Sequence, residues 1–187
     1  NSLMAYGISR VDGVLADLGV SSHQFDEASR GFSTRMNAPL DMRMNVMQVL
    51  DAKKIINEYE DEQLASLFYY YGELRESRKL AREIVNHRKT KIIETTDDLK
   101  KLFSYIPQFK QNKFFAQVFQ AIRIEVNQEL EVLKEMLVQS YNTLKPQGRL
   151  VVISYHSLED RLVKRFLKNG MFEGEPARDI YGNFSKI

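Results

Sequence analysis

The chain has 187 residues and a formal net charge of only +2 at pH 7, so any affinity for nucleic acid has to come from local basic patches. The sequence lacks cysteine, which excludes a disulfide framework and a thiolate metal site and fits a reducing cytoplasm, so we expect a cytoplasmic protein. No apolar run is long enough to span a membrane and the N-terminus lacks a signal-peptide pattern, so we expect no membrane association.

A short apolar stretch near the N-terminus has the pattern of a parallel strand that is buried on both faces. Residues 11–16 are rich in branched side chains, and Asp17 follows where this run ends. Ligands of open α/β sheets bind just beyond the carboxyl ends of the strands, so Asp17 with Ser21, Ser22 and Gln24 could hold a polar small molecule. The alternative is a strand that ends in an ordinary capped turn, which the same residue types favour.

Residues 18–45 predict a long loop. Loops of this length in compact domains are usually functional or disordered. Large apolar side chains recur along this one and could pin it to a core, so we expect an ordered, functional loop. These side chains are Phe25, Phe32, Leu40, Met42 and Met44.

A block of helical patterns follows, without the alternation of a strand anywhere between residues 45 and 111. The expected helices cover residues 51–59, 61–72, 73–87 and 96–103. Such a block is consistent with a small helical domain inserted into another domain, and we place it at residues 48–111. The third of these helices carries a cluster of basic side chains that could hold a phosphate backbone, or that could simply form a solvated helix face. The main candidates are Arg78, Arg82, Arg88 and Lys89.

The apolar spacing of residues 113–144 predicts one long helix. Arg123, Glu125 and Glu129 lie beside its apolar stripe, where ion pairing on the helix surface is the simplest interpretation. Asn127 is a poor residue for a helix interior, so a bend or a ligand-binding role is possible at that position.

A second buried strand is predicted at residues 149–154, and a helix follows it with Ser157 as N-cap and Asp160 at the third helical position. If the two strands are parallel neighbours, the polar residues at both strand ends share one crevice. His156 there could be a base, a nucleic-acid contact or a structural histidine. The histidines lack metal-ligand spacing, so we expect no metal site.

Several blocks of the sequence, taken together and in order, resemble one family. This is the bacterial ribosomal RNA small subunit methyltransferase H family, of the MraW type. The blocks are DGVLADLGVSS at residues 12–22, RGFS at 30–33, PLDMRM at 39–44, YGE at 71–73, FQAIRIEVN at 119–127 and ISYHSLEDR at 153–161, the last resembling the family's ISFHSLEDR. The resemblance covers nearly the whole chain.

The resemblance implies an α/β fold, namely a class I, Rossmann-like methyltransferase fold that depends on S-adenosylmethionine and carries an inserted all-helical domain. Residues 1–47 and 112–187 would form the Rossmann part, and residues 48–111 would recognise RNA. The implied reaction is methylation of the N4 amine of a cytidine, position 1402, in 16S ribosomal RNA. The implied partner is that RNA or the small ribosomal subunit, with a homodimer possible.

The resemblance also assigns residues. Asp17 and Gln24 would contact S-adenosylmethionine, although His23 stands where the family has proline. Ser21, Ser22, His156 and Ser157 are the candidates for the catalytic group, because acceptors aimed at the amine N–H bonds would favour its reactive form. The RNA-binding candidates Arg78, Arg82, Arg88 and Lys89 come from the basic cluster described above and not from the resemblance.

The family's glycine-rich cofactor loop is missing from this sequence. We therefore expect an incomplete fold that is inactive by itself, within a parent protein that is an enzyme. The alternative is a noncatalytic module that binds RNA or assists ribosome assembly. A DNA amino-methyltransferase is a third interpretation, which the strand-end motifs disfavour.

Overall fold

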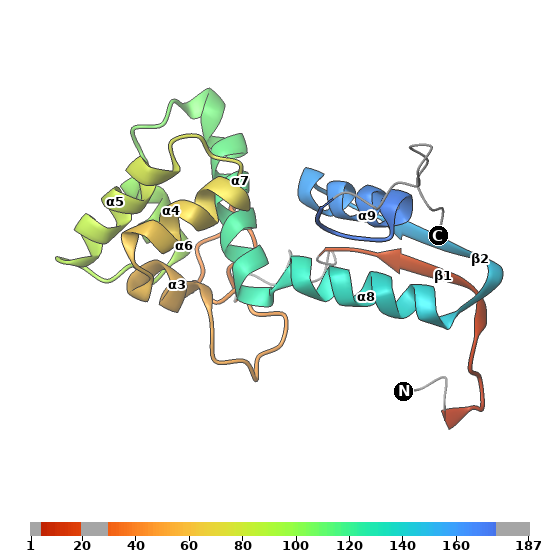
Figure 1. The fold of residues 1–187 in the computed structure, drawn as a ribbon. Helices are drawn as coiled ribbons and strands as arrows, with labels where there is room; N and C mark the ends of the chain where they lie inside the picture. The colour runs from red at the N-terminus through yellow and green to blue at the C-terminus, as the bar shows by residue number, and fades with distance from the viewer. Residues whose placement is uncertain (1–4, 20–29, 175–187) are drawn as a thin grey trace, which may run out of the picture. The chain divides into compact units, whose positions relative to one another are not determined.

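The computed structural model describes residues 5–19 and 30–174 and divides at Gly19 and at Leu130 into two compact units (Figure 1). The sheet unit consists of the described residues up to Gly19 and those from Leu130 onward. The helical unit consists of the described residues between them. None of the described helices is both long and apolar enough to cross a membrane.

The sheet unit contains the two predicted strands, and they are parallel neighbours, which is the condition under which the two strand ends were expected to share one crevice. Strand β1 (Val11–Asp17) pairs with β2 (Leu144–Ile153), and the register places Asp17 opposite Ile153. The carboxyl ends of both strands therefore meet at the same edge of the sheet, where ligands of α/β folds bind. Helices α8 (Glu129–Thr143, part of this unit from Leu130) and α9 (Ser157–Asn169) complete the unit.

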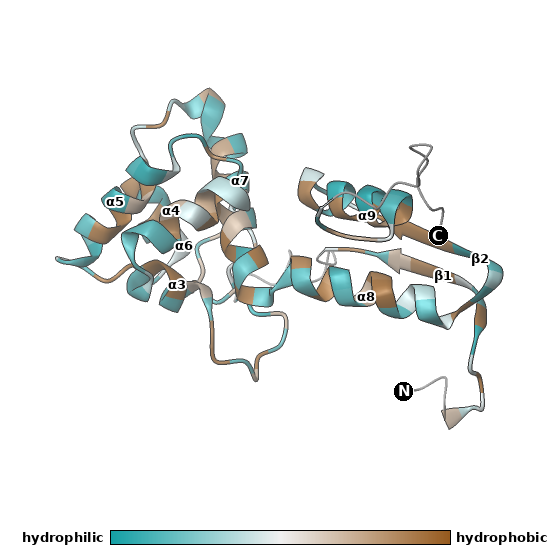
Figure 2. Ribbon diagram, in the orientation of Figure 1, coloured by the Kyte–Doolittle hydropathy of each residue, from teal (hydrophilic) through white to brown (hydrophobic). Residues whose placement is uncertain are grey.

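One side of the sheet packs on a small apolar core. Leu133 and Leu137 of α8 and Val163 of α9 are buried, and Leu150 and Val152 of β2 pack against them. The alternate positions point the other way, and Leu15, Val151 and Ile153 are 71%, 51% and 45% exposed. Burial of both strand faces was thus a wrong prediction for the described residues, because the helices of this unit contribute apolar contacts on one side. Figure 2 shows the hydrophobic residues along β2.

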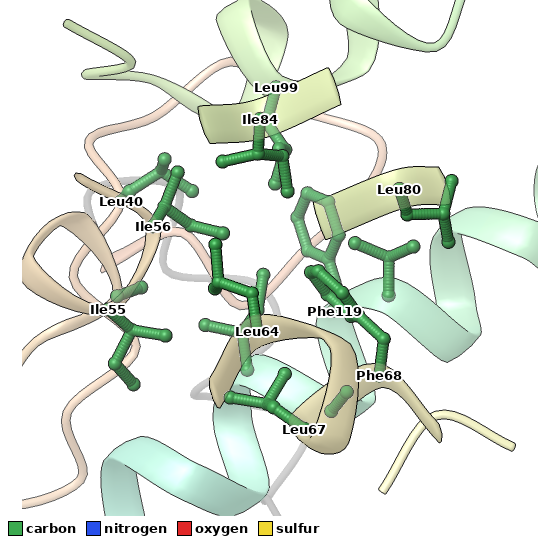
Figure 3. Close-up of a cluster of buried hydrophobic side chains, with 14 of the residues drawn as sticks. Leu40, Ile55, Ile56, Leu64, Leu67, Phe68, Leu80, Ile84, Leu99 and Phe119 are labelled. Atoms are coloured by element: carbon green, nitrogen blue, oxygen red, sulfur yellow. The ribbon is translucent and has the colours of Figure 1, made fainter. Parts of the chain in front are cut away.

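The helical unit contains α3 (Ala52–Glu58), α4 (Asp61–Tyr70), α5 (Ser77–Arg88), α6 (Thr96–Leu102) and α7 (Gln108–Asn127). The first four correspond to predicted helices, although α5 begins at Ser77 because residues 71–76 form a turn. Helix α3 starts where the Asp51 carboxylate accepts the Lys54 amide at 2.8 Å. Leu64, Phe68 and Phe119 belong to the shared core (Figure 3).

The helical unit extends beyond the predicted insert of residues 48–111. Phe32, Leu40 and Met42 from the preceding loop are buried in its core, and so is the apolar face of α7. Residues 30–47 and α7 therefore belong to this unit and not to the sheet unit, which corrects the predicted boundaries. The apolar stripe of α7 showed that the helix must bury a face, but it did not show against which element.

The predicted long helix is two helices. Gln128 has φ 49° and ψ 39°, a left-handed conformation that ends α7, and α8 begins at Glu129. A left-handed residue interrupts the helical hydrogen-bond pattern. The bend that Asn127 suggested therefore occurs one residue later.

Candidate active site at the strand ends

Asp17 and Tyr155 bring the two strand ends together. The Tyr155 hydroxyl donates a hydrogen bond to Asp17 Oδ1 at 2.8 Å. The Leu18 amide donates to the Ile153 carbonyl at 3.0 Å, which extends the strand pairing by one residue. Polar groups from both strand ends thus share one place, as expected from parallel neighbours. Tyr155 belongs to the polar segment predicted at the second strand end, but its hydrogen bond to Asp17 depends on the register between two segments that are 138 residues apart.

His156 caps helix α9, a position that the sequence suggested for Ser157. The Glu159 amide donates to His156 Nδ1 at 3.4 Å, and His156 Nε2 lies 3.3 Å from Glu159 Oε1. The His156 side chain is only 9% exposed. Nδ1 is thus used as a helix cap, while Nε2 is buried and makes no hydrogen bond to the residues that the structure describes. The capping role and the burial favour the structural interpretation of His156 over that of a base. Ser157 lies in the first turn of α9 and is exposed.

Glu159 is a buried carboxylate behind the strand end. It accepts the Tyr155 amide at 2.9 Å and its side chain is 4% exposed. Burial by itself would raise the pKa of Glu159, but the His156 ring and the Tyr155 amide outweigh burial and hold this pKa below its usual value. Glu159 therefore stays ionised and anchors the backbone of Tyr155.

Replacing Glu159 by glutamine (Glu159→Gln) should lower the free energy of unfolding by about 1 kcal/mol at neutral pH, because the charged acceptor is lost. The folded-state pKa of Glu159 lies below the usual 4.5. The stabilisation that ionised Glu159 gives to the folded state is thus complete above pH 4.5 and is lost as the pH falls through the folded-state pKa. Urea unfolding of wild type and variant from about pH 7 to pH 3 should show the two converging in acid. Glu135→Gln, an exposed glutamate on α8, is the matched control, and a pH-independent difference for Glu159→Gln would contradict the assignment.

The remaining residues predicted at the first strand end lie outside the described residues. They are Ser21, Ser22 and Gln24. Of the predicted site, the structure therefore describes Asp17 with His156 and Ser157.

A separate groove of about 570 Å³ runs between β1 and α8, lined by apolar side chains such as Val14, Val132 and Met136. It lies beside the body of β1, whereas Asp17 stands at the end of that strand and is not among the lining residues. The groove is therefore distinct from the candidate site.

The loop blocks RGFS and PLDMRM organise the helical unit. Arg30 donates to the carbonyl oxygens of Arg43 and Met44. Arg43 binds Asp41 through two nitrogens at 2.8 and 2.9 Å. Asn127 at the end of α7 holds the same loop: it accepts the Met44 amide at 2.6 Å and donates to the Met42 carbonyl at 2.8 Å. The described part of the loop is therefore ordered, as predicted, and Asn127 is its clamp.

The YGE block and the FQAIRIEVN block of α7 also make contacts within the helical unit. Gln120 donates to the Tyr71 carbonyl at 3.0 Å and Gln117 to the Gly72 carbonyl at 2.9 Å. A Cβ at Gly72 would lie 2.8 Å from the Phe68 carbonyl oxygen, so this close approach requires glycine. Arg123 and Glu129 form a bidentate pair at 2.8 and 3.1 Å.

Three of the four predicted RNA-binding residues lie on one exposed side of α5, two within the helix and Lys89 at its C-cap. Arg78, Arg82 and Lys89 are exposed, and their spacings of four and seven residues are close to one and two helical turns. Arg88 differs, because its guanidinium donates to the Ile56 carbonyl at 2.9 Å and thereby joins α5 to α3. Arg82 Nε lies 3.9 Å from Asp61 on the open surface, a pair of little energetic weight.

Comparison with known proteins matches residues 1–178 to the MraW methylase family. The chain is 61% identical over 184 residues to the ribosomal RNA small subunit methyltransferase H of Flavobacterium johnsoniae. The proteins of the same name from Christiangramia forsetii and Parabacteroides distasonis are 60% and 56% identical. In each case the match covers 98% of this chain and 61% of the relative, so the chain spans about three fifths of the length of these relatives.

Proposed function

The chain belongs to the MraW methylase family, and from this premise we propose that the protein methylates the N4 amine of cytidine 1402 in 16S ribosomal RNA with S-adenosylmethionine as methyl donor. The observation that carries the proposal is the meeting of Asp17 and Tyr155 at the carboxyl edge of two parallel strands. This edge is where α/β folds bind small ligands. The family names of the relatives support the RNA substrate.

The groups at this edge fit the cofactor. Asp17 is exposed, and Tyr155 contacts one of its two carboxylate oxygens. The other oxygen, Oδ2, receives no hydrogen bond from the residues that the structure describes. A carboxylate oxygen that the described residues leave unbound suits the hydroxyl or ammonium groups of S-adenosylmethionine. Asp17 and Gln24 would hold this molecule, which supplies a methyl group already activated on a sulfonium.

The protein's task is then to orient the amine, because positioning supplies much of the rate enhancement when the donor is already reactive. The cytosine has to leave its stack to enter such a site. His156 caps helix α9 through Nδ1 and its side chain is only 9% exposed, so we assign the amine acceptor to Ser21, Ser22 or Ser157.

The helical unit would hold the RNA through α5. Arg78, Arg82 and Lys89 line one face of that helix, and they can approach successive phosphates without entering the core. Arg88 is excluded from this set, because its guanidinium already binds the Ile56 carbonyl.

The test separates the two ligands in the full product of the gene. Asp17→Ala should weaken binding of S-adenosylmethionine, measured by calorimetry, by about ten- to a hundredfold, since a charged acceptor is lost. It should leave RNA binding and its salt dependence unchanged. Arg78→Ala with Arg82→Ala should weaken RNA binding and lower its salt slope by about 0.7 per arginine, with no change in cofactor affinity.

The matched control is Lys101→Ala with Lys113→Ala, which removes the same charge from exposed positions outside α5. This pair should change the salt slope less than the arginine pair does. RNA binding without any cofactor binding would favour the noncatalytic RNA-binding module. If the arginine pair lowered cofactor affinity as much as Asp17→Ala, the division between the two sites would be wrong.

A further inference from the structure

We infer that Tyr155 is a positioning residue for the cofactor, because its hydroxyl holds the Asp17 carboxylate in place through Oδ1 and does not contact the second carboxylate oxygen, Oδ2. The inference rests on the proposed role of Asp17 in binding S-adenosylmethionine. It assigns a task to the one residue of the ISYHSLEDR block at which this chain has tyrosine and the family's block, ISFHSLEDR, has phenylalanine.

The geometry is specific to this pair of side chains. Tyr155 donates to Asp17 Oδ1 at 2.8 Å, and a Cβ added at Gly19 would lie 3.4 Å from Tyr155 Cδ2. The Tyr155 ring thus passes close to Gly19, and its hydroxyl reaches the Asp17 carboxylate. Because Tyr155 is 67% exposed, core packing does not account for its position.

The backbone under Tyr155 is held from the buried side. Its amide donates to Glu159 Oε2 at 2.9 Å, and Glu159 is 3% exposed. The preceding strand residue, Ile153, accepts the Leu18 amide at 3.0 Å. Tyr155 therefore starts from an anchored backbone, which is the kind of support that keeps a binding group in one orientation.

The chemistry of the donor matters for the ligand. A phenol donates a hydrogen bond without bringing a positive charge, whereas lysine or arginine at this place would neutralise Asp17. The hydrogen bond to Asp17 and the negative charge of that carboxylate raise the pKa of Tyr155, so the hydroxyl remains a donor at physiological pH. A phenol therefore brings no positive charge next to Asp17, which suits a ligand with a cationic group such as S-adenosylmethionine.

The experiment is a double-mutant cycle in the full product of the gene, with S-adenosylmethionine affinity measured by calorimetry. Tyr155→Phe keeps the ring and removes the hydroxyl, and should weaken binding by about three- to tenfold. In the Asp17→Ala background the same change should have no further effect, because the hydroxyl then has no carboxylate to hold. The thermal midpoint should stay the same, since the hydroxyl is on the surface.

Tyr141→Phe is the matched control, because Tyr141 is a 56% exposed tyrosine on α8 of the same unit. It should leave cofactor affinity unchanged. Weaker binding in Asp17→Ala with unchanged binding in Tyr155→Phe would overturn this inference and leave the proposed function standing. Unchanged binding in Asp17→Ala, or no binding by the wild type, would instead refute the proposed cofactor site. An equal loss for Tyr155→Phe in both backgrounds would overturn the inference, because the hydroxyl would then act independently of Asp17.

Discussion

Replacing Gly31 by alanine (Gly31→Ala) should lower the free energy of unfolding by about 3–5 kcal/mol, because the new Cβ meets two obstacles at once. Gly31 has φ +72°, which side chains of L residues rarely adopt, and a Cβ there would lie 2.4 Å from the Pro39 carbonyl oxygen. The segment around Pro39 has little room to retreat, since Leu40 is 2% exposed and its amide donates to the Glu94 carbonyl at 3.0 Å. Urea unfolding followed by far-ultraviolet circular dichroism measures the loss.

Gly7 serves as a control that separates the cost of a positive φ from the cost of the steric clash. Gly7 has φ +71° and a Cβ there would meet nothing within 4 Å. Gly7→Ala should therefore show the conformational cost alone, about 1–2 kcal/mol at most. A loss for Gly31→Ala no larger than that for Gly7→Ala would contradict the steric argument.

Replacing Asn127 by alanine (Asn127→Ala) should lower the free energy of unfolding by about 2–4 kcal/mol, because two backbone groups of the loop lose their partner. The Met44 amide donates to Asn127 Oδ1 at 2.6 Å, and Asn127 Nδ2 donates to the Met42 carbonyl at 2.8 Å. Met42 is 1% exposed, so water cannot easily replace the lost bond to its carbonyl. The same urea titration measures stability, and hydrogen exchange should show that the Met44 amide loses protection.

Two further variants define what Asn127 contributes. Asn127→Asp keeps an acceptor for the Met44 amide but has no donor for the Met42 carbonyl, so its loss of stability should be intermediate between wild type and Asn127→Ala. Asn86→Ala changes an exposed asparagine of the helical unit whose side chain accepts from Lys89 at 3.3 Å, and should cost little. Equal stability of Asn127→Ala and Asn86→Ala would contradict the role of Asn127 as a clamp.

Both predictions concern sequence blocks that resemble a methyltransferase family, and in both the residues act through the fold. Arg30, Gly31 and Asn127 shape one ordered loop against the core of the helical unit. Gln117 and Gln120 likewise attach the turn after α4 to α7. A strong motif therefore identified the family, while its individual residues in this unit serve packing. The candidate chemistry lies at the strand ends of the sheet unit.

The sequence by itself determined the local elements and the family. Residues 11–16 and 149–154 predicted two strands because short runs of branched side chains favour that structure, and both strands are present. The helices of residues 51–103 followed from caps and apolar spacing, which depend on neighbours three or four positions apart. The ordered blocks identified the MraW methylase family, which the family match confirms.

Tertiary structure alone decided which groups meet. Tyr155 reaches Asp17 across 138 residues, a contact set by strand register and invisible to local spacing. Arg88 hydrogen-bonds to α3, while Arg78 and Arg82 stay exposed. The sequence of a helix does not show which of its polar side chains has a neighbouring element within hydrogen-bond distance. His156 rather than Ser157 caps α9, since the strand pairing and the buried Glu159 determine where the helix begins. Local sequence patterns indicate which segments can form helices or strands. Long-range packing determines which side chains meet, and therefore which residues make up the candidate site at the strand ends.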